Sequence, residues 1–482
     1  MTKANTKIKR WVLPKPINQG EIKNCSINYT LQKVLSRRGL NLEEELLNFL
    51  TPLPLPNANE HFNELNKATN RIIEACNKNE KIAICGDYDA DGITSTVLLV
   101  ELLSKLGANP IPCIPSRQED GYGLNLKMIN DISTNKIKLV ITVDNGISAF
   151  DAIKRSQELG IDLVITDHHK IPNKKIDIFA LIHPEQSPNN SPYKCLAGVG
   201  IAYMLAINIC KEIDYDIEKT TAGILFCIGT VADMAPLVGA NRKWLKECLP
   251  KFHTTKNIGI RAIVKKLSLD DSNITTEDIG FKIAPLINAV GRIGDPNLII
   301  KLLTSTSEKT IKKLTNDCFS LNKERKRITA LAEQDALKLA LIESINNRKF
   351  LVIINKEWHL GIIGIVAARI VDRYNLPTAI LTKASDGIYR GSIRSNNRIK
   401  VNLALDECSE ILLAYGGHSA AAGFTINEEN IPRLKEMLNN IAINELNNSN
   451  IEKSIKPDAC LLFKDINYDF YRQLISVGPF GI

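Results

Sequence analysis

Three apolar runs of strand length in the first half of the chain each end in acidic or imidazole side chains. The run 81–86 leads into Asp87-Tyr88-Asp89-Ala90-Asp91-Gly92, the run 139–143 into Asp144-Asn145-Gly146, and the run 161–166 into Asp167-His168-His169. Loops at the carboxyl ends of parallel strands converge on one crevice of an open sheet, so these groups can share a site although they are far apart in sequence. The pattern therefore predicts a mostly parallel α/β sheet with a metal-dependent site at one edge.

The length of the chain and its hydrophobic pattern predict several domains. A chain of 482 residues exceeds what one hydrophobic core usually organises. Strand-length runs alternate with helical patterns up to about residue 240, as in βαβ units, and a second α/β pattern begins at Phe350. We expect an N-terminal helical segment at 1–58, a parallel-sheet domain at 59–245, a helical connector that ends in a long helix at 246–345, a smaller α/β domain at 346–446, and a short segment at 447–482. That last segment cannot bury a core of its own, so it is either a strand added to an existing domain or the stump of a missing one.

Charge, cysteine content and hydropathy restrict the class of protein. The net charge of +8 is compatible with a polyanionic partner, although it is spread over a chain rich in both signs. Eleven cysteines without a CxxC pair argue against a zinc ribbon and against a disulfide framework. No stretch approaches the roughly 20 apolar residues that span a bilayer, and Pro14 and Pro16 follow the basic N-terminus before any apolar leader develops. We expect a soluble cytoplasmic protein without a membrane partner.

The acidic loop after the first run has the composition of a site for hard divalent cations. Asp87, Asp89 and Asp91 occupy alternate positions, so in an extended conformation all three would point the same way. Three carboxylates on one face repel each other unless cations neutralise them, and oxygen-rich clusters suit Mg²⁺ or Mn²⁺. A calcium-loop lookalike or a solvated acidic turn remains the alternative.

Three further segments complete the predicted cluster. Asp144 lies in an Asp-Asn-Gly sequence that is also common in ordinary turns. The imidazoles after Asp167 favour Mn²⁺, Fe²⁺ or Zn²⁺, and manganese satisfies both the imidazoles and the carboxylates. Asp233 is flanked by apolar residues in 229–237, so it should be protonated, paired or metal-bound, with a helix N-cap as the alternative. Together these groups could hold two metals about 3.5 to 4 Å apart, a separation that clamps the attacking and leaving oxygens of a displacement at phosphorus.

Basic and small polar residues in other loops are candidates for phosphate contacts. Arg117 and Arg292 lie in glycine-containing loops, and the arginine fork suits phosphate oxygens, although each could equally be a surface ion-pair partner. Ser392 and Arg394, with His418 beside two glycines, could form an anion cradle, or simply a glycine-rich turn with a solvated arginine.

These motifs, taken together, resemble those of the RecJ family in the DHH phosphoesterase superfamily. The matching segments follow the family's order over nearly the whole chain and are 87–92, 144–146, 167–169, 229–237, 288–295, 358–369 and 416–424. The resemblance implies two bound ions, Mn²⁺ or Mg²⁺, held by Asp87, Asp89, Asp91, Asp144, His168 and Asp233. It also implies that His169, with Asp167 beside it, acts at the scissile phosphate, and that Arg117, Arg292, Ser392 and Arg394 are candidates for contacts with DNA phosphates or the 5′ end. The domains at 59–245 and 346–446 would then be a DHH domain and a DHH-associated domain.

The function that the resemblance implies is 5′ to 3′ hydrolysis of single-stranded DNA to 5′-mononucleotides in repair and recombination. A single-strand-binding protein and a helicase are expected partners, and a monomer is the family expectation. RecJ proteins usually continue beyond a Pro-Phe-Gly element into an oligonucleotide-binding barrel, which we expect to be absent here, with weaker binding of long DNA. Two alternatives stay open: a DHH phosphoesterase for short oligoribonucleotides or cyclic dinucleotides, and an inert DNA-binding scaffold.

Overall fold

The chain folds into two compact units in a computed structural model that describes residues 10–15, 27–41, 43–116, 121–174, 176–346, 348–396, 399–447 and 454–481. The parallel-sheet unit comprises Trp11–Phe319 and Ile455–Ile482. The mixed-sheet unit comprises Met1–Arg10 and Ser320–Ser454. Each unit is built around its own five-stranded sheet.

The sheet of the parallel-sheet unit has the strand order β3-β2-β4-β5-β6, and every neighbouring pair is parallel. Its strands are β2 (Lys81–Cys85), β3 (Asn109–Cys113), β4 (Leu139–Val143), β5 (Asp162–Thr166) and β6 (Ala180–Ile182). The chain moves outward from β2 to β3 and then returns to place β4 on the other side of β2. The strand order therefore reverses between β2 and β4, and ligands of open α/β sheets bind at the carboxyl ends of strands beside such a reversal. The predicted parallel α/β sheet is confirmed.

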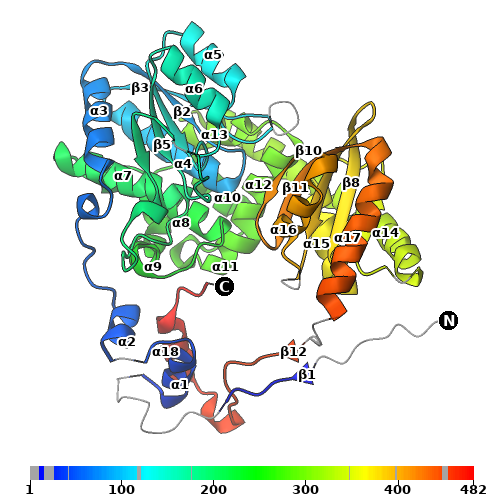
Figure 1. Ribbon diagram of the computed structural model, residues 1–482. Helices are drawn as coiled ribbons and strands as arrows, with labels where there is room; N and C mark the ends of the chain where they lie inside the picture. Colours follow the sequence, from blue (N-terminus) through cyan, green and yellow to red (C-terminus); the bar gives the residue numbers. More distant parts are fainter. Residues whose placement is uncertain are drawn as a thin grey trace. The chain divides into compact units, whose positions relative to one another are not determined.

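Helices cover both faces of this sheet, which explains why all residues of the central strand β4 are buried rather than alternating between buried and exposed (Figure 1). One face packs against α5 (Leu126–Thr134) and α6 (Phe150–Glu158). The other packs against α3 (Leu65–Asn77), α4 (Ala90–Lys105) and α7 (Gly198–Glu212). A further layer consists of α8 (Ala222–Ala232), α9 (Gly239–Cys248), α10 (Ile258–Lys266), α11 (Thr276–Asp278), α12 (Ala284–Ile293) and α13 (Asn297–Thr304). Because α4 lies between the sheet and α8, it is buried around most of its circumference.

Segments from the two ends of the sequence pack together in the parallel-sheet unit. They are α1 (Tyr29–Arg37), α2 (Glu43–Leu50) and α18 (Tyr468–Val477). Their shared core includes Leu31, Leu46 and Phe470. The segment that we expected to be an added strand or a stump contains the two-residue strand β12 (Ser454–Ile455) as well as α18, whose apolar residues recur with helical spacing and whose first turn is capped by Asn467.

A buried arginine joins these terminal segments to α9. Only 2% of Arg242 is exposed, and its guanidinium donates to four main-chain carbonyl oxygens, those of Phe49, Val477, Gly478 and Pro479, at 2.6–3.2 Å. The guanidinium also lies 3.5 Å from the centre of the Phe49 ring. Burial lowers the pKa of Arg242 to about 10, so the side chain keeps its charge near neutral pH.

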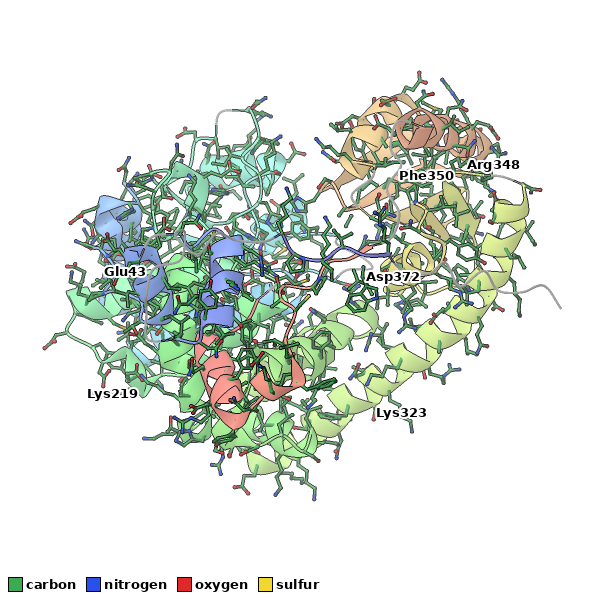
Figure 2. All side chains as sticks on the ribbon, turned by 90° about the horizontal axis from the view of Figure 1, so that it is seen from below. Glu43, Lys219, Lys323, Arg348, Phe350 and Asp372 are labelled. Atoms are coloured by element: carbon green, nitrogen blue, oxygen red, sulfur yellow. The ribbon has the colours of Figure 1, made fainter. Side chains whose placement is uncertain are left out.

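The mixed-sheet unit has the strand order β10-β11-β9-β8-β7, with a parallel β7/β8 pair and antiparallel neighbours elsewhere. Its strands are β7 (Leu351–Ile354), β8 (Thr378–Ser385), β9 (Ile388–Arg394), β10 (Leu412–Gly417) and β11 (Ala421–Asn427), and its helices are α15 (Ile363–Tyr374), α16 (Val401–Glu407) and α17 (Ile431–Asn447). The predicted long helix is α14 (Glu308–Ile345), whose later part belongs to this unit. Figure 2 shows Phe350 among the packed side chains of this unit and Lys323 on the exposed side of α14. Among the described residues, no helix is long and apolar enough to cross a membrane.

Candidate metal centre

The acidic loop after β2 turns directly into α4. Asp89 caps this helix, because its Oδ1 accepts hydrogen bonds from the backbone N–H groups of Asp91 at 2.9 Å and Gly92 at 3.1 Å. The N–H of Ala90 donates to Oδ1 of Asn288 in α12 at 2.8 Å. Asp91 therefore lies in the first helical turn, so the three aspartates do not lie along one extended segment.

Asp91 receives two backbone donors from the N-terminus of α7. Its Oδ2 accepts from the N–H of Gly198 at 2.8 Å, and its Oδ1 accepts from the N–H of Val199 at 2.6 Å. These N–H groups belong to the first turn of α7, where they have no partner within the helix and where the helix dipole favours a negative charge. A Cβ atom at Gly198 would lie 2.5 Å from Cβ of Asp144, so only glycine lets α7 approach this closely.

The residue after β4 is held in a left-handed backbone conformation. Asp144 has a φ of 63°, which is uncommon for a residue other than glycine, and the Tyr122 hydroxyl donates to its carbonyl oxygen at 2.9 Å. Asn145 fixes the turn, because its amide donates to the carbonyl of Cys85 at 3.0 Å and its Oδ1 accepts from the N–H of Leu124 at 3.0 Å. The ends of β2 and β4 are thereby tied together beside the strand reversal.

The two histidines after β5 have different partners. Nε2 of His168 lies 2.9 Å from Oδ1 of Asp144, and its Nδ1 lies 4.0 Å from Oδ2 of Asp233. Nδ1 of His169 instead lies 2.7 Å from Oδ1 of Asp167. Asp167 also accepts from the N–H groups of His168, His169 and Ile147 at 2.7–3.0 Å. The structure thus brings His168 into the carboxylate cluster, whereas Asp167 orients His169.

The charges of Asp167 and His169 stabilise each other. Burial alone would raise the pKa of Asp167, but the hydrogen bonds from His169 and from the backbone N–H groups outweigh it and lower that pKa. Burial opposes the charged form of His169 as well, and the Asp167 carboxylate overcomes this effect and raises the pKa of His169. Both shifts favour an imidazolium–carboxylate pair.

All six predicted metal ligands lie close together. Together with His169, their side chains form three groups, and within each group the potential ligand atoms lie within 4.8 Å of one another. The groups are Asp87/Asp89/Asp144, Asp91/His168/Asp233 and Asp144/His168/His169. Asp233 follows the last turn of α8, so the alternative that it caps a helix N-terminus is wrong.

The electrostatics of the cluster fit a site for divalent cations. Burial and the nearby Asp89 raise the pKa of Asp233 to about 7. Burial, followed by repulsion from neighbouring carboxylates, raises the pKa of Asp91 and that of Asp144 well above the ordinary value. Carboxylates in this state take up protons or cations, and a donor set of carboxylate oxygens with one imidazole suits Mn²⁺ or Mg²⁺.

The predicted phosphate contacts are distributed over both units. Arg117 lies outside the described residues. Arg292 is in the last turn of α12, next to Gly291, where a Cβ atom would lie 2.0 Å from the carbonyl oxygen of Tyr88, so α12 packs directly on the acidic loop.

The other three candidates lie together within the mixed-sheet unit. Nη1 of Arg394 donates to Oγ of Ser392 at 3.1 Å, and both side chains lie on β9. His418 follows β10, and Ala421, which accepts from the N–H of His418 at 2.8 Å, is paired with Arg394 across the sheet. These three residues thus come from adjoining parts of one sheet, and the anion cradle stays a prediction.

Several residues that build the site were not assigned a role from the sequence. They are Tyr122, His183, Gly198, Val199 and Asn288. Asn288 and Tyr122 lie in segments that the sequence singled out for their arginines. His183 follows directly after β6, so the strand-end rule applied to the other strands would have found it. No local signal marks the first turn of α7 as the donor to Asp91.

Known protein families match the sequence regions that contain the two five-stranded sheets. The DHH family, N-terminal domain, matches residues 81–230, and the DHHA1 domain matches residues 347–444. The single-stranded-DNA-specific exonuclease RecJ of Bacillus subtilis is 33% identical over 98% of this chain, which spans 60% of that protein. The RecJ of Haemophilus influenzae is 31% identical over 86% of this chain and 76% of its own length. The crystal structure of RecJ from Thermus thermophilus in complex with Mn²⁺ superposes with a TM-score of 0.84 and 25% identity, covering 98% of this chain and 68% of that one.

Proposed function

The chain belongs to the RecJ family, and on that premise we propose that it is a metal-dependent 5′ to 3′ exonuclease. It would hydrolyse single-stranded DNA to 5′-mononucleotides and act in DNA repair and recombination. The observation that carries this proposal is the cluster of carboxylates around His168 at the strand reversal of a parallel sheet. Relatives of similar sequence are named for single-stranded-DNA-specific exonuclease activity, which supports the choice of substrate.

The cluster would hold two divalent ions, Mn²⁺ or Mg²⁺. The proposed ligands are Asp87, Asp89, Asp91, Asp144, His168 and Asp233. When bound, such ions supply positive charge against the negative charge that develops on the phosphate during hydrolysis. Backbone N–H groups of α7 hold Asp91, and the turn stabilised by Asn145 holds Asp144, so these carboxylates are oriented before any ion binds.

His169 would act at the scissile phosphate. Because Nδ1 of His169 is engaged by Asp167, Nε2 is the ring atom that can donate to a phosphate oxygen or to the leaving oxygen. Nε2 lies 3.2 Å from the Tyr122 hydroxyl oxygen, which can accept its hydrogen bond. When DNA is bound, a phosphate oxygen would replace this hydroxyl as the acceptor. The Asp167 carboxylate raises the pKa of His169 and so favours the protonated ring that such donation requires. We therefore propose that Asp167 orients His169 and favours its protonated form, and that it is not a metal ligand.

The remaining contacts would select and position the strand. Arg117, Arg292, Ser392, Arg394 and His418 are proposed to bind DNA phosphates, including the 5′ end. We further propose that the protein works as a monomer in the cytoplasm. A single-strand-binding protein and a helicase are proposed as partners, since an enzyme that requires single strands depends on proteins that expose or maintain them.

The test is hydrolysis of oligodeoxynucleotides that carry a label at the 5′ or the 3′ end, in the presence of Mn²⁺. We expect 5′-labelled mononucleotide to appear first from single strands and not from blunt duplexes. Asp144→Asn should lower the rate by about 10³-fold or more while preserving the circular dichroism spectrum, because it removes a ligand shared by two groups of the cluster. Asp271→Asn, at an exposed acid of the helical layer, is the matched control and should retain the wild-type rate.

Three outcomes would contradict the proposal. Release of the 3′ label first would reverse the polarity. Faster turnover of cyclic dinucleotides or short oligoribonucleotides than of DNA in the same assay would favour the other class of phosphoesterase. Binding of single strands without any turnover in Mn²⁺ or Mg²⁺ would indicate an inert scaffold.

A further inference from the structure

His183 is a fully buried histidine whose two ring nitrogens have different hydrogen-bonding roles. Nε2 lies 2.7 Å from the carbonyl oxygen of His169, and Nδ1 accepts a hydrogen bond from the backbone N–H of Glu185 at 3.1 Å. A carbonyl oxygen only accepts, so Nε2 carries the proton, and a backbone N–H only donates, so Nδ1 carries none. The ring is therefore neutral and fixed as one tautomer, and burial, which lowers the pKa of His183, acts in the same direction.

The sheet register explains why His183 reaches this carbonyl. Ile182, the last residue of β6, is paired with Thr166, the last residue of β5. His183 thus leaves the sheet at the same level as the Asp167-His168-His169 tripeptide. The hydrogen bond crosses from the edge strand to the main chain of the residue proposed to act at the phosphate.

His169 is consequently held at two places. Asp167 accepts from both its ring Nδ1 and its backbone N–H, at 2.7 and 3.0 Å, which orients the imidazole. The ring of His183 holds its carbonyl oxygen from the neighbouring strand end. Rotation of this peptide group would displace the Cα atom of His169, and the imidazole would move with it.

We propose that His183 is a positioning residue that fixes the main chain of His169, so that the imidazole meets the scissile phosphate in a productive orientation. The proposal rests on the proposed function, because it assigns a role toward the same reaction. His183 does not touch the reacting atoms, and it lies outside the groups of potential metal ligands. Its loss should therefore act on the chemical step and leave metal and strand binding in place.

The experiment compares two side chains of nearly equal length that differ in one group. His183→Gln keeps an N–H at the reach of Nε2, whereas His183→Met fills similar space without a donor. We expect His183→Met to lower kcat about 10- to 100-fold, the effect of displacing a reacting group by roughly 1 Å, with KM and the Mn²⁺ dissociation constant within about twofold of wild type. His183→Gln should recover most of the lost kcat.

His61 provides the control for loss of a partly buried imidazole. Its ring packs edge-on against Tyr193, with ring centres 5.3 Å apart. His61→Met should leave kcat at the wild-type level. Circular dichroism of each variant checks that the fold is retained.

A second measurement is independent of turnover. In protein labelled with ¹³C and ¹⁵N, the HNCO signal of Lys170 reports the carbonyl shift of His169. This shift should change in His183→Met and return toward the wild-type value in His183→Gln. If wild type fails to hydrolyse DNA, the proposed function fails, and the carbonyl shift still decides whether His183 holds His169.

The inference is overturned by any of four results. Wild-type kcat in His183→Met would show that the contact does not matter for the reaction. Equal impairment of the Met and Gln variants, or a loss of Mn²⁺ affinity that matches the loss of kcat, would indicate a general structural role. An unchanged carbonyl shift in His183→Met would show that the hydrogen bond is absent.

Discussion

Replacing Asp233 by asparagine should stabilise the metal-free protein and impair the metal-bound one. Burial and the nearby Asp89 raise the pKa of Asp233 from an ordinary value of 3.8 to about 7. A difference of roughly three pKa units corresponds to about 4 kcal/mol between the protonated and ionised forms. Because 30% of the Asp233 side chain is exposed, solvent screening reduces this to about 2 kcal/mol.

The sign of the pH dependence follows from the direction of the shift. The folded-state pKa lies above the unfolded one, so the stabilisation by the bound proton is complete below about pH 4 and is lost as the pH rises through about 7. Because part of this stabilisation is already lost between pH 4 and pH 5, metal-free wild type should lose about 1 kcal/mol of unfolding free energy between pH 5 and pH 8 through Asp233. Asp91 and Asp144, whose pKa values are also raised, add to the loss. Asp233→Asn lacks the Asp233 share and should be about 2 kcal/mol more stable than wild type at pH 8.

The assay is urea unfolding followed by circular dichroism at pH 5 and pH 8, after treatment with EDTA and again with added Mn²⁺. Mn²⁺ at about 100 times its dissociation constant should stabilise wild type by about 2.7 kcal/mol and stabilise the variant less, which reduces the variant's advantage at pH 8. Asp271→Asn should follow wild type under all conditions. The reasoning is refuted if metal-free wild type is equally stable at both pH values, or if Asp233→Asn loses stability as steeply as wild type.

Two further predictions concern the packing that supports the cluster. Gly198→Ala places a Cβ atom 2.5 Å from Cβ of Asp144 and should weaken Mn²⁺ binding at least about tenfold, as measured by calorimetry. In the control Gly280→Ala the new Cβ atom would meet only a methyl group at 3.6 Å, so Mn²⁺ should bind normally. Equal Mn²⁺ affinities of the two variants would contradict the close approach of α7. Arg242→Leu leaves four carbonyl acceptors without their donor and should lower the unfolding free energy by about 3 kcal/mol or more. It should also make residues 455–481 more sensitive to proteolysis. A loss of unfolding free energy below about 1 kcal/mol would show that the buried guanidinium does not hold the terminal segments.

The sequence was sufficient to predict the parallel sheet and the convergence of its strand ends, because both depend on local patterns. Apolar runs of strand length and the residues that end them can be recognised without knowing the rest of the fold. The conformation of the acidic loop could not be predicted in this way. The alternate spacing of Asp87, Asp89 and Asp91 is compatible with an extended segment in which all three point the same way. In the structure Asp89 caps α4 and Asp91 lies in the first turn of that helix. The reason is that an aspartate followed by a helix-forming run satisfies the first-turn N–H groups.

The supporting residues were harder to predict because their partners are distant in sequence. Gly198 is 107 residues from the carboxylate to which its N–H donates, and Ala90 is 198 residues from Asn288. A glycine at a helix start or an asparagine within a helix has many ordinary explanations. Only the packing of α7 and α12 against the first turn of α4 gives these residues their role.

The number of protein donors on each carboxylate distinguishes the roles of neighbouring aspartates. Asp167 accepts four hydrogen bonds, three of them on Oδ1, so its acceptor sites are largely occupied by the tripeptide and by Ile147. Asp91 accepts one backbone N–H on each oxygen, which leaves lone pairs for a cation and fixes the direction of the carboxylate. Both residues are buried acids near a strand end or a helix start, and their sequence contexts alone do not separate them. The hydrogen-bond donors do, because an aspartate whose acceptor sites are filled by the protein can orient a histidine but has little capacity to bind a metal ion.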